Sequence, residues 1–414
     1  MNEGKIIRFY REKNKLTQEQ LGRGICSGTH LSKIERLHTE YAPEIITLLS
    51  DRLGINIEYE LTKLNNIKRL LNHWQDVIIM QLFDEMDLIN QELEQEDLIQ
   101  ISDYKNLYQL LRVRYLLMHG LTEDALNIIY EIQKKEHKLS AYEANLFKHV
   151  LGIYYLAKHE NLKAIQALKS INETDYNNKE YTYHLAVAYH SIESPVMAYF
   201  YAEKSRQFFK EINNYLRVID AEMLMLIQVK DDGDFKESIQ RFKKLIKSCE
   251  LCNSPDRKAR VFHNLAFEYF RRNNFELASK YYKESMSIKH KESGPYLLSL
   301  EGYIRSSLNG SILPQEELLQ LAKEGLETAV KKKESLYINL FNLLCYLIQD
   351  KEQEYHRFLC DQALPMFKQF GFVYLIQRSK KELFNYYIKL KQTNKALKMA
   401  ELLINHEKKA CHFS

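Results

Sequence analysis

The stretch LTQEQLGRGICSGTHLSKIERLHTEYAPEIITLLSDRLG, residues 16–54, decides the fold of the N-terminal part of this chain. Thr17 suits the N-cap of a short helix, because its hydroxyl can accept a hydrogen bond from a free backbone amide. Gln20, three residues on, completes a capping box. The glycines of residues 22–24 supply the permissive backbone that a tight turn between two helices needs. Ser27 then suits the N-cap of the next helix.

This next helix is expected over roughly residues 28–37, and its two faces differ in character. Leu31 and Ile34 have the spacing of an inward face. The outward face carries polar residues, which are Thr29, His30, Ser32 and Lys33. We expect a preceding helix over residues 5–14 and a following one that begins at Pro43 and ends at Gly54.

The ordered set TQEQL, GICS and LSKIE resembles the Cro/repressor-type (XRE) helix-turn-helix family. In that family the second helix of the motif lies in the DNA major groove. The resemblance implies the DNA-facing residues Gln18, Ser27, Thr29, His30, Ser32 and Lys33, with Gln18 near a phosphate. It also implies that Glu35 has an internal role, pairing with a basic side chain such as Arg11. The chain departs from the family pattern at Gly22, where Ala is usual, and at Arg36-Leu37, near the helix end.

Local charge does not by itself decide whether this domain binds DNA. Residues 1–70 hold twelve Lys and Arg against nine Asp and Glu, a net charge of +3. Tight binding would then need a dimer, which doubles the number of phosphate contacts. The alternative is a domain that has lost DNA binding and serves as a dimerisation or protein-binding cap.

The composition indicates a large, almost entirely helical protein. The chain has 414 residues with only 13 Gly and 6 Pro, so helix breakers are scarce. Its net charge of +4 is nearly balanced over this length, so any nucleic-acid contact is local. No apolar run approaches 18 residues and no signal peptide follows Met1, so we expect a cytoplasmic protein.

The chain carries no recognisable signature of an enzyme, metal site or cofactor. There is no glycine-rich phosphate loop, HExxH motif or nucleophile motif. Six cysteines are scattered, and Cys249 with Cys252 forms a lone CxxC without a second pair of ligands. We therefore expect no catalysis, no metal and no cofactor.

A repeated spacing organises the chain after residue 70. A small or apolar residue is followed by an aromatic three positions later and a small residue twelve positions later. The copies are Ala186/Tyr189/Ala198, Ala266/Tyr269/Ala278, Phe384/Tyr387/Ala396, Gly152/Tyr155/Ala164 and a weaker Val113/Leu116/Ala125. Small residues recur where two antiparallel helices cross closely, and each hairpin needs the next to cover its apolar face. Between residues 300 and 375 the match fails, and we expect Gly302, Gly310, Pro314 and Pro365 to break the chain differently.

The repeats resemble tetratricopeptide repeats, although only the interval from Gly152 to Ala186 has the family's period of 34 residues and the other intervals are longer. The expected fold is all-α, with an N-terminal helix-turn-helix followed by a right-handed superhelix of tetratricopeptide-like hairpins. The expected domains are residues 1–60 for the helix-turn-helix, 61–75 for a linker and 76–414 for the repeats. The concave face of such a superhelix can hold an extended peptide, and Asn side chains suit its backbone groups.

An XRE helix-turn-helix followed by such repeats resembles the RRNPP family of Gram-positive regulators. The resemblance implies a regulator that binds operator DNA as a homo-oligomer, a dimer or higher, and is switched by a short re-imported signalling peptide. In these receptors Asn and basic residues on the inner helices hold the peptide, so the resemblance implies the peptide-binding candidates Asn264, Asn339, Asn342, His184, His263 and Arg260. Two alternatives remain: a phosphorelay inhibitor that sequesters a response-regulator protein, and a prophage or plasmid decision regulator of the same architecture.

Overall fold

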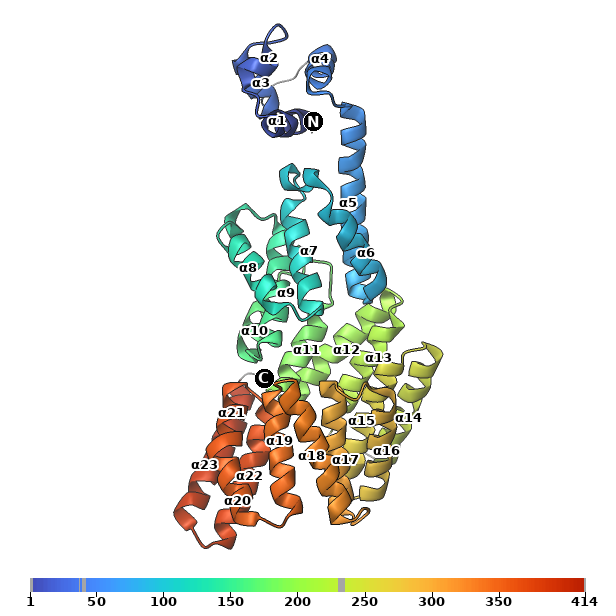
Figure 1. Ribbon diagram of the computed structural model, residues 1–414, viewed down its shortest axis with the longest axis vertical. Coiled ribbons are helices and arrows are strands. Elements are labelled where there is room, and N and C mark those ends of the chain that lie inside the picture. The colour runs from blue at the N-terminus through green and yellow to red at the C-terminus, as the bar shows by residue number, and fades with distance from the viewer. Residues whose placement is uncertain (1–2, 37, 39–41, 230–234, 413–414) are drawn as a thin grey trace. The chain divides into compact units, whose positions relative to one another are not determined.

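The computed structural model describes residues 3–36, 38, 42–229 and 235–412, with side chains described as far as Ile404. All regular elements in these residues are helices, as Figure 1 shows, which confirms the all-α prediction. The chain divides into two compact units. Unit 1 comprises Met1–Tyr154 with Thr174–Tyr176, and unit 2 comprises Tyr155–Glu173 with Asn177–Ser414.

Unit 1 begins with the four helices of the predicted helix-turn-helix domain, α1 (Glu3–Lys13), α2 (Gln18–Gly22), α3 (Gly28–Glu35) and α4 (Pro43–Leu53). Its core is built from the apolar residues of all four helices, including Ile7, Leu21, Leu31, Ile34 and Leu49. Helix α3 is capped at its C-terminal end by Arg36, so it ends before Leu37, which lies outside the described residues. Pro43 stands in the first turn of α4, and Gly54 ends it with a φ of 69°, as the sequence predicted.

The rest of unit 1 is a set of longer helices. They are α5 (Ile57–Met80), α6 (Phe83–Glu94), the 3-10 turn η1 (Asp97–Ile101), α7 (Lys105–Met118), α8 (Thr122–Gln133), the 3-10 turn η2 (Glu136–Lys138) and α9 (Ala141–Ala157). Trp74 of α5 is fully buried, and its indole Nε1 donates to the Met86 carbonyl at 3.1 Å. Residues 61–75, which we expected to link two domains, lie within the unbroken helix α5.

Unit 2 consists of helices joined by short turns. They are α10 (Asn161–Lys169), α11 (Tyr181–Ser191), α12 (Pro195–Glu211), α13 (Tyr215–Leu226), α14 (Phe235–Leu251), α15 (Pro255–Arg271), α16 (Phe275–Ile288), α17 (Gly294–Asn309), α18 (Gln315–Lys331), α19 (Ser335–Ile348), α20 (Glu352–Phe358), the π turn η3 (Leu359–Ala363), α21 (Leu364–Gln369), α22 (Val373–Lys389) and α23 (Thr393–His412). Each helix packs against its neighbour in the chain, most extensively in the pairs α15–α16, α11–α12 and α16–α17. The predicted helical hairpins are therefore present.

The repeated spacing found in the sequence has a structural counterpart in every copy. In each copy, the turn between the two helices contains a residue with positive φ. This residue stands seven positions after the first residue of the pattern. These residues are Gly120, His159, Glu193, Asn273 and Lys391. The small residues Ala186, Ala198, Ala266 and Ala278 are fully buried. One turn geometry and one set of close helix crossings thus recur along the chain.

An aromatic pair recurs in the two best copies. Tyr189 of α11 stacks on Tyr201 of α12 with ring centroids 5.5 Å apart. Eighty positions further on, Tyr269 of α15 stacks on Tyr281 of α16 at 5.5 Å. The aromatic residue of the sequence pattern therefore fills the space beside the small residue, as expected.

The expectation that Gly302 breaks the chain was wrong. Gly302 lies inside α17 and is buried against the ring of Tyr282, where a Cβ atom would come within 2.4 Å of Cζ. It is the small residue of a further repeat, 36 positions after Ala266. Gly325 of α18 stands in the same way against Phe341 of α19. The match failed in the sequence because Arg305 stands where the pattern has an aromatic residue, and Pro314, which caps α18, stands where it has a small one.

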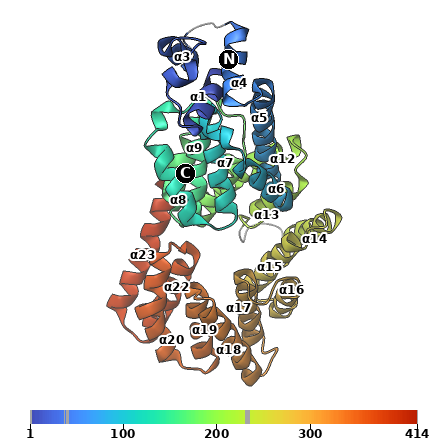
Figure 2. The same ribbon diagram turned by 45° about the horizontal axis from the view of Figure 1, so that its top comes forward.

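The odd-numbered helices from α11 to α19 also contact one another from hairpin to hairpin, and more closely than the even-numbered helices do. In Figure 2 the hairpins from α14 to α23, yellow to red, follow one another around an arc. A curved stack is tightest on its inner side, so the odd-numbered helices line the inner face of unit 2.

Candidate functional site

The helix-turn-helix is fixed locally by the caps that the sequence predicted. The Thr17 hydroxyl accepts from the Gln20 backbone amide at 3.1 Å, and the Gln20 side chain accepts from the Thr17 amide at 2.8 Å. The Ser27 hydroxyl accepts from the His30 amide at 3.1 Å and so starts α3. Gly24, with a φ of 75°, supplies the turn. These bonds fix where α3 begins and which of its faces points outward.

A buried ion pair joins α1 to α3, as the helix-turn-helix resemblance implied. Arg11 Nε donates to Glu35 Oε1 at 2.6 Å, and Arg11 Nη2 donates to Oε2 at 3.0 Å. Arg11 Nη1 also donates to the Leu16 carbonyl at 2.9 Å. Hydrogen bonding to Glu35 raises the pKa of Arg11. Gln18 Nε2 donates to Glu35 Oε2 at 2.8 Å, so this predicted phosphate contact is held by the same carboxylate.

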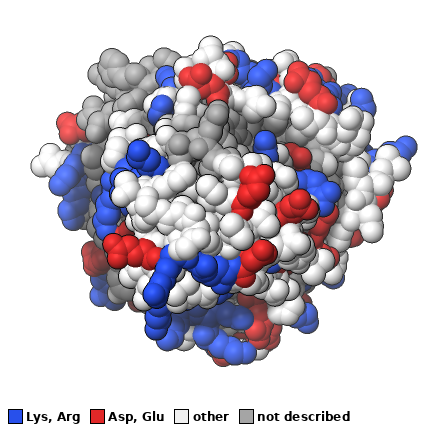
Figure 3. All heavy atoms as spheres, turned by 90° about the horizontal axis from the view of Figure 1, so that it is seen from above, with Lys and Arg blue, Asp and Glu red and all other residues white. Residues whose placement is uncertain are grey.

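The outward face of α3 is open to solvent. Thr29 and Lys33 are exposed, whereas His30 and Ser32 are partly buried beside the fully buried Leu31. Ser27 is also exposed, but its hydroxyl already accepts the hydrogen bond from the His30 amide that caps α3. Figure 3, viewed from above, shows Lys and Arg side chains interspersed with Asp and Glu on the visible face.

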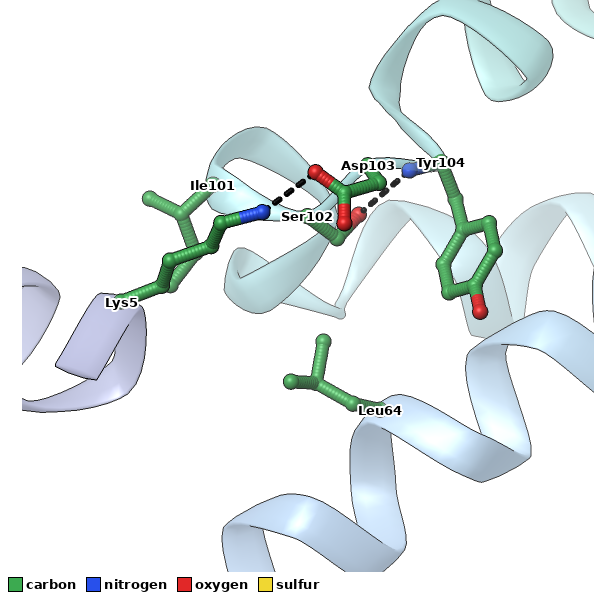
Figure 4. Close-up of a pocket in the computed structure, with 6 residues that line it drawn as sticks. All are labelled: Lys5, Leu64, Ile101, Ser102, Asp103 and Tyr104. Atoms are coloured by element: carbon green, nitrogen blue, oxygen red, sulfur yellow. Dashed lines mark hydrogen bonds and ion pairs between the residues drawn. The ribbon is translucent and has the colours of Figure 1, made fainter. Parts of the chain in front are cut away.

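Within unit 1, α1 also reaches the segment around η1. Lys5 pairs with Asp103, which Figure 4 shows beside Leu64 of α5, and Lys13 Nζ lies 2.9 Å from Asp97 Oδ2. Burial and a hydrogen bond to Glu60 raise the pKa of Tyr10 to about 12. The helix-turn-helix is thus tied by its first helix to the helices that follow it.

The six peptide-binding candidates lie on odd-numbered helices of unit 2. Arg260, His263 and Asn264 are together on α15, His184 is on α11, and Asn339 with Asn342 is on α19. Asn264 is partly buried and has no hydrogen bond to the described part of the chain. The other two asparagines bond back to their own helix, with Asn339 Nδ2 donating to the Ser335 carbonyl and Asn342 Nδ2 to the Ile338 carbonyl. The structure therefore groups the α15 residues and separates them from those of α19.

A hollow of unit 2 lies beside α19. It has a volume of about 650 Å³ and is lined from α17, α19, α20 and α22, including Arg305, Tyr346, Tyr355, Glu382 and Asn385. None of the six predicted residues lines it. Its charged residues are of both signs, so it favours neither an anion nor a cation.

Three arginines converge on one carboxylate beside α15. Asp220 of α13 is 1% exposed. Its Oδ1 accepts from Arg257 Nε and Arg260 Nη2, each at 3.1 Å. Its Oδ2 accepts from Arg257 Nη2 at 2.9 Å and from Arg217 Nη1 at 3.3 Å. Arg260 therefore lies on the inner face with its guanidinium anchored to Asp220 through Nη2.

A polar chain continues from α15 towards α17. His263 Nδ1 lies 2.9 Å from the Ser299 hydroxyl, and Lys289 Nζ donates to the same hydroxyl at 2.7 Å. Burial, with the charge of Lys289, lowers the pKa of His263 to about 3. Burial and the charge of Arg260 lower the pKa of Lys289 to about 8. His263 is therefore neutral at pH 7, while Lys289 still carries its charge.

Sequence reasoning missed Asp220, Arg217, Arg257 and Lys289. The run RKAR at residues 257–260 was a visible signal, since two arginines three residues apart share one helix face. Asp220 and Lys289 carried no such signal, because only folding places them beside α15. Within the described residues, no group of three or more His, Cys, Asp or Glu could hold a metal ion.

The comparisons with known proteins agree with both parts of the chain. A family model described as Helix-turn-helix matches residues 7–59. "Transcriptional activator NprA" of Geobacillus stearothermophilus is 22% identical over 84% of this chain and 89% of its own length. Over most of its length the chain is thus similar to regulators of the RRNPP type.

Other RRNPP-type proteins share the fold at low identity. "Response regulator aspartate phosphatase E" of Bacillus subtilis (strain 168) is 22% identical over 66% of this chain and 78% of its own length. The structure of the apo form of the quorum sensor NprR from B. thuringiensis matches with a TM-score of 0.65, 18% identity, 83% of this chain and 99% of that one. A Rap protein complexed with competence and sporulation factor matches with a TM-score of 0.72, 14% identity, 84% of this chain and 99% of that one. No described helix is long and apolar enough to cross a membrane.

Proposed function

We propose that this chain is an RRNPP-type transcriptional regulator that binds operator DNA through α3 and is switched by a short peptide on the inner face of unit 2. The observation that carries the proposal is the helix-turn-helix with its open outward face. Thr29 and Lys33 are exposed there, while Leu31 and Ile34 are fully buried. A regulator of this kind acts by binding, and we propose no catalytic step.

The DNA contact follows from the geometry of α3. Its N-terminal turn starts at the Ser27 cap, and the exposed side chains of Thr29 and Lys33 project from one face. In helix-turn-helix proteins this helix lies in the major groove, and its first residues contact base edges. A net charge of +3 over residues 1–70 is modest, so we propose that two copies bind a two-fold symmetric operator.

The peptide contact rests on the inner face. Asn264 presents an amide that has no partner in the described residues and can both donate to and accept from a peptide backbone. Two of the solved structures with this fold are complexes with peptides, NprR with its cognate peptide NprX and the Rap conjugation gene regulator of the plasmid pLS20 with the Phr* peptide. We place the peptide along α15, with His184, Arg260 and His263 beside it and Asn339 and Asn342 further along.

A response-regulator partner is the second candidate function. It is favoured by the match to an aspartate phosphatase, which covers 66% of this chain. A DNA-binding test separates the two proposals, because sequestering a protein does not need the outward face of α3. A prophage or plasmid decision regulator would differ only in the genes that the operator controls.

The DNA test begins with duplexes selected from a random library by the wild-type protein. Replacing Thr29 and Lys33 together by Ala should weaken binding, since losing one good base contact costs about 1–3 kcal/mol. The matched control replaces Thr62 and Lys68 of α5 by Ala, which removes the same residue types from exposed positions. Equal affinity of wild type and the α3 variant would refute the recognition-helix assignment.

The peptide test uses Asn264→Ala. Truncation leaves peptide amide groups without a partner, which costs about 1–3 kcal/mol, or roughly tenfold in affinity. Calorimetry with a peptide selected on the wild-type protein measures the change. The matched control is Asn65→Ala, which replaces an exposed Asn within the helix α5. An unchanged affinity removes Asn264 from the site.

A further inference from the structure

The inner face beside α15 carries more positive than negative charge. The group comprises four cations, Arg217, Arg257, Arg260 and Lys289, and two carboxylates, Asp220 and Glu180. Buried or partly buried charge is costly unless it is neutralised. Two carboxylates cannot neutralise all four of these cations.

The carboxylates are taken up by the two arginines that lie deepest. Arg217 is 4% exposed and lies between Asp220 at 3.3 Å and Glu180 at 3.7 Å. Arg257 holds Asp220 through two nitrogens, Nε at 3.1 Å and Nη2 at 2.9 Å. Both Asp220 oxygens are therefore saturated, and Arg260 shares only one of them through Nη2 at 3.1 Å.

Arg260 keeps most of its binding capacity free. Its side chain is 47% exposed, and Nη2 is the nitrogen that meets Asp220. Within the described residues its Nε and Nη1 hydrogen-bond to nothing. Because Nη2 gives only one of its two hydrogens to Asp220, one edge of the guanidinium, Nη2 together with Nε or with Nη1, can still donate to two oxygens of a carboxylate.

Lys289 has no carboxylate partner in the described part of the chain. Its ammonium donates to the Ser299 hydroxyl at 2.7 Å and to the Pro295 carbonyl at 3.1 Å, both of which are neutral. Arg260 stands close enough to lower its pKa to about 8, in the same direction as burial does. His263, one turn along α15 from Arg260, bonds the same Ser299 hydroxyl and supplies no charge at neutral pH.

We propose that Arg260 and Lys289 form a subsite for a carboxylate of the bound peptide, so that this chain selects peptides with an acidic group. The inference rests on the proposed function, in which a peptide lies along α15. In an unmodified peptide the only anions at neutral pH are Asp and Glu side chains and the C-terminal carboxylate. Such a group replaces the repulsion between two neighbouring cations by two charge-assisted contacts.

The test uses three libraries of random heptapeptides on the full-length protein. The first contains all residues and has an amidated C-terminus. The second lacks Asp and Glu but has a free C-terminal carboxylate. The third lacks Asp and Glu and is amidated, so it has no carboxylate. We expect binders from the first or the second library and none of comparable affinity from the third. The library that supplies the binders identifies the source of the carboxylate.

Selected peptides are then measured on the double variant Arg260→Gln/Lys289→Gln, which removes both charges and keeps side chains able to hydrogen-bond. We expect affinity to fall by about tenfold or more. The control is Arg241→Gln, because Arg241 of α14 is 52% exposed and paired with Glu237 on the same helix. Circular dichroism and thermal melting verify that each variant is folded.

The outcomes separate the inference from the proposed function. Equally tight binders from the carboxylate-free library, or full affinity in the folded double variant, would overturn the carboxylate subsite and leave peptide binding intact. A lack of binders from all three libraries would overturn peptide binding itself, and the subsite with it.

Discussion

Acid should lower the free energy of unfolding of unit 2 through protonation of His263. The His263 ring is largely buried on α15, and its pKa in the folded protein is lowered to about 3. In the unfolded chain an ordinary histidine has a pKa of about 6.5. Between these values the unfolded state binds more protons, so the stability contributed by neutral His263 is present above pH 6.5 and is lost as the pH falls towards 3.

From pH 7 to pH 5 the folded ring stays neutral, so the loss depends on the unfolded value alone. Protonating one histidine of pKa 6.5 at pH 5 favours the unfolded chain by about 2 kcal/mol, at 1.36 kcal/mol per pH unit. Replacing His263 by Asn keeps a hydrogen-bonding partner for Ser299 and removes the titration. Urea unfolding followed by circular dichroism, at pH 7 and pH 5, should therefore show a pH-dependent loss about 2 kcal/mol smaller in the variant.

The exposed His137→Asn is the matched control, because it removes a histidine from the short turn η2. Its pH dependence should follow the wild type. If His263→Asn also loses as much stability between pH 7 and pH 5 as the wild type does, then the ring is not held neutral in the folded state, and the reasoning fails.

Three further changes test the packing. Gly302→Ala should destabilise by about 1–3 kcal/mol in urea unfolding, because its Cβ would stand 2.4 Å from the buried Tyr282 ring; a neutral effect would contradict the close helix crossing. Gly22→Ala should stabilise by about 0.5–1 kcal/mol, since its Cβ meets only ordinary contacts, the nearest at 3.7 Å; a lower unfolding midpoint would show that this turn needs glycine. Glu35→Gln should cost about 3 kcal/mol, the low end for a broken buried pair, because the exposed Glu12, 3.4 Å from Arg11, stays as a weaker counter-charge. An unchanged free energy of unfolding would contradict this cost.

The helix-turn-helix could be predicted from the sequence because its signals are local. Thr17, Gln20 and Ser27 act on amides within three residues, so the residue types alone fix the helix starts. The Arg11–Glu35 pair came from the family resemblance. The DNA-facing residues stay predictions, and the structure adds that Gln18 is bound to Glu35.

The repeats could be predicted where their spacing was constant and not where it changed. In all five copies, the turn residue with positive φ stands seven positions after the first residue of the pattern. Gly302 looked like a helix breaker because a lone glycine more often ends a helix than packs against a ring. Its role depends on Tyr282, which lies twenty residues earlier, and no local rule connects the two.

The inner-face cluster shows why charge patterns in a sequence do not reveal a binding site. Arg11 and Arg260 both pair with a buried carboxylate, and both lie on amphipathic helices. The Arg11 pair is closed: Glu35 uses both oxygens on Arg11, and Nη1 ends on the Leu16 carbonyl, so the guanidinium has a structural role. Arg260 shares Asp220 with two other arginines and keeps an open edge beside Lys289, which has no counter-ion among the described residues. A closed pair stabilises the fold, whereas an open excess of charge on an inner face is neutralised only by something that binds there. The number of partners around each cation therefore distinguishes a structural ion pair from a cation that can bind a ligand. For Arg260 the neighbouring charged groups come from α13, α15 and the end of α16, which only folding brings side by side.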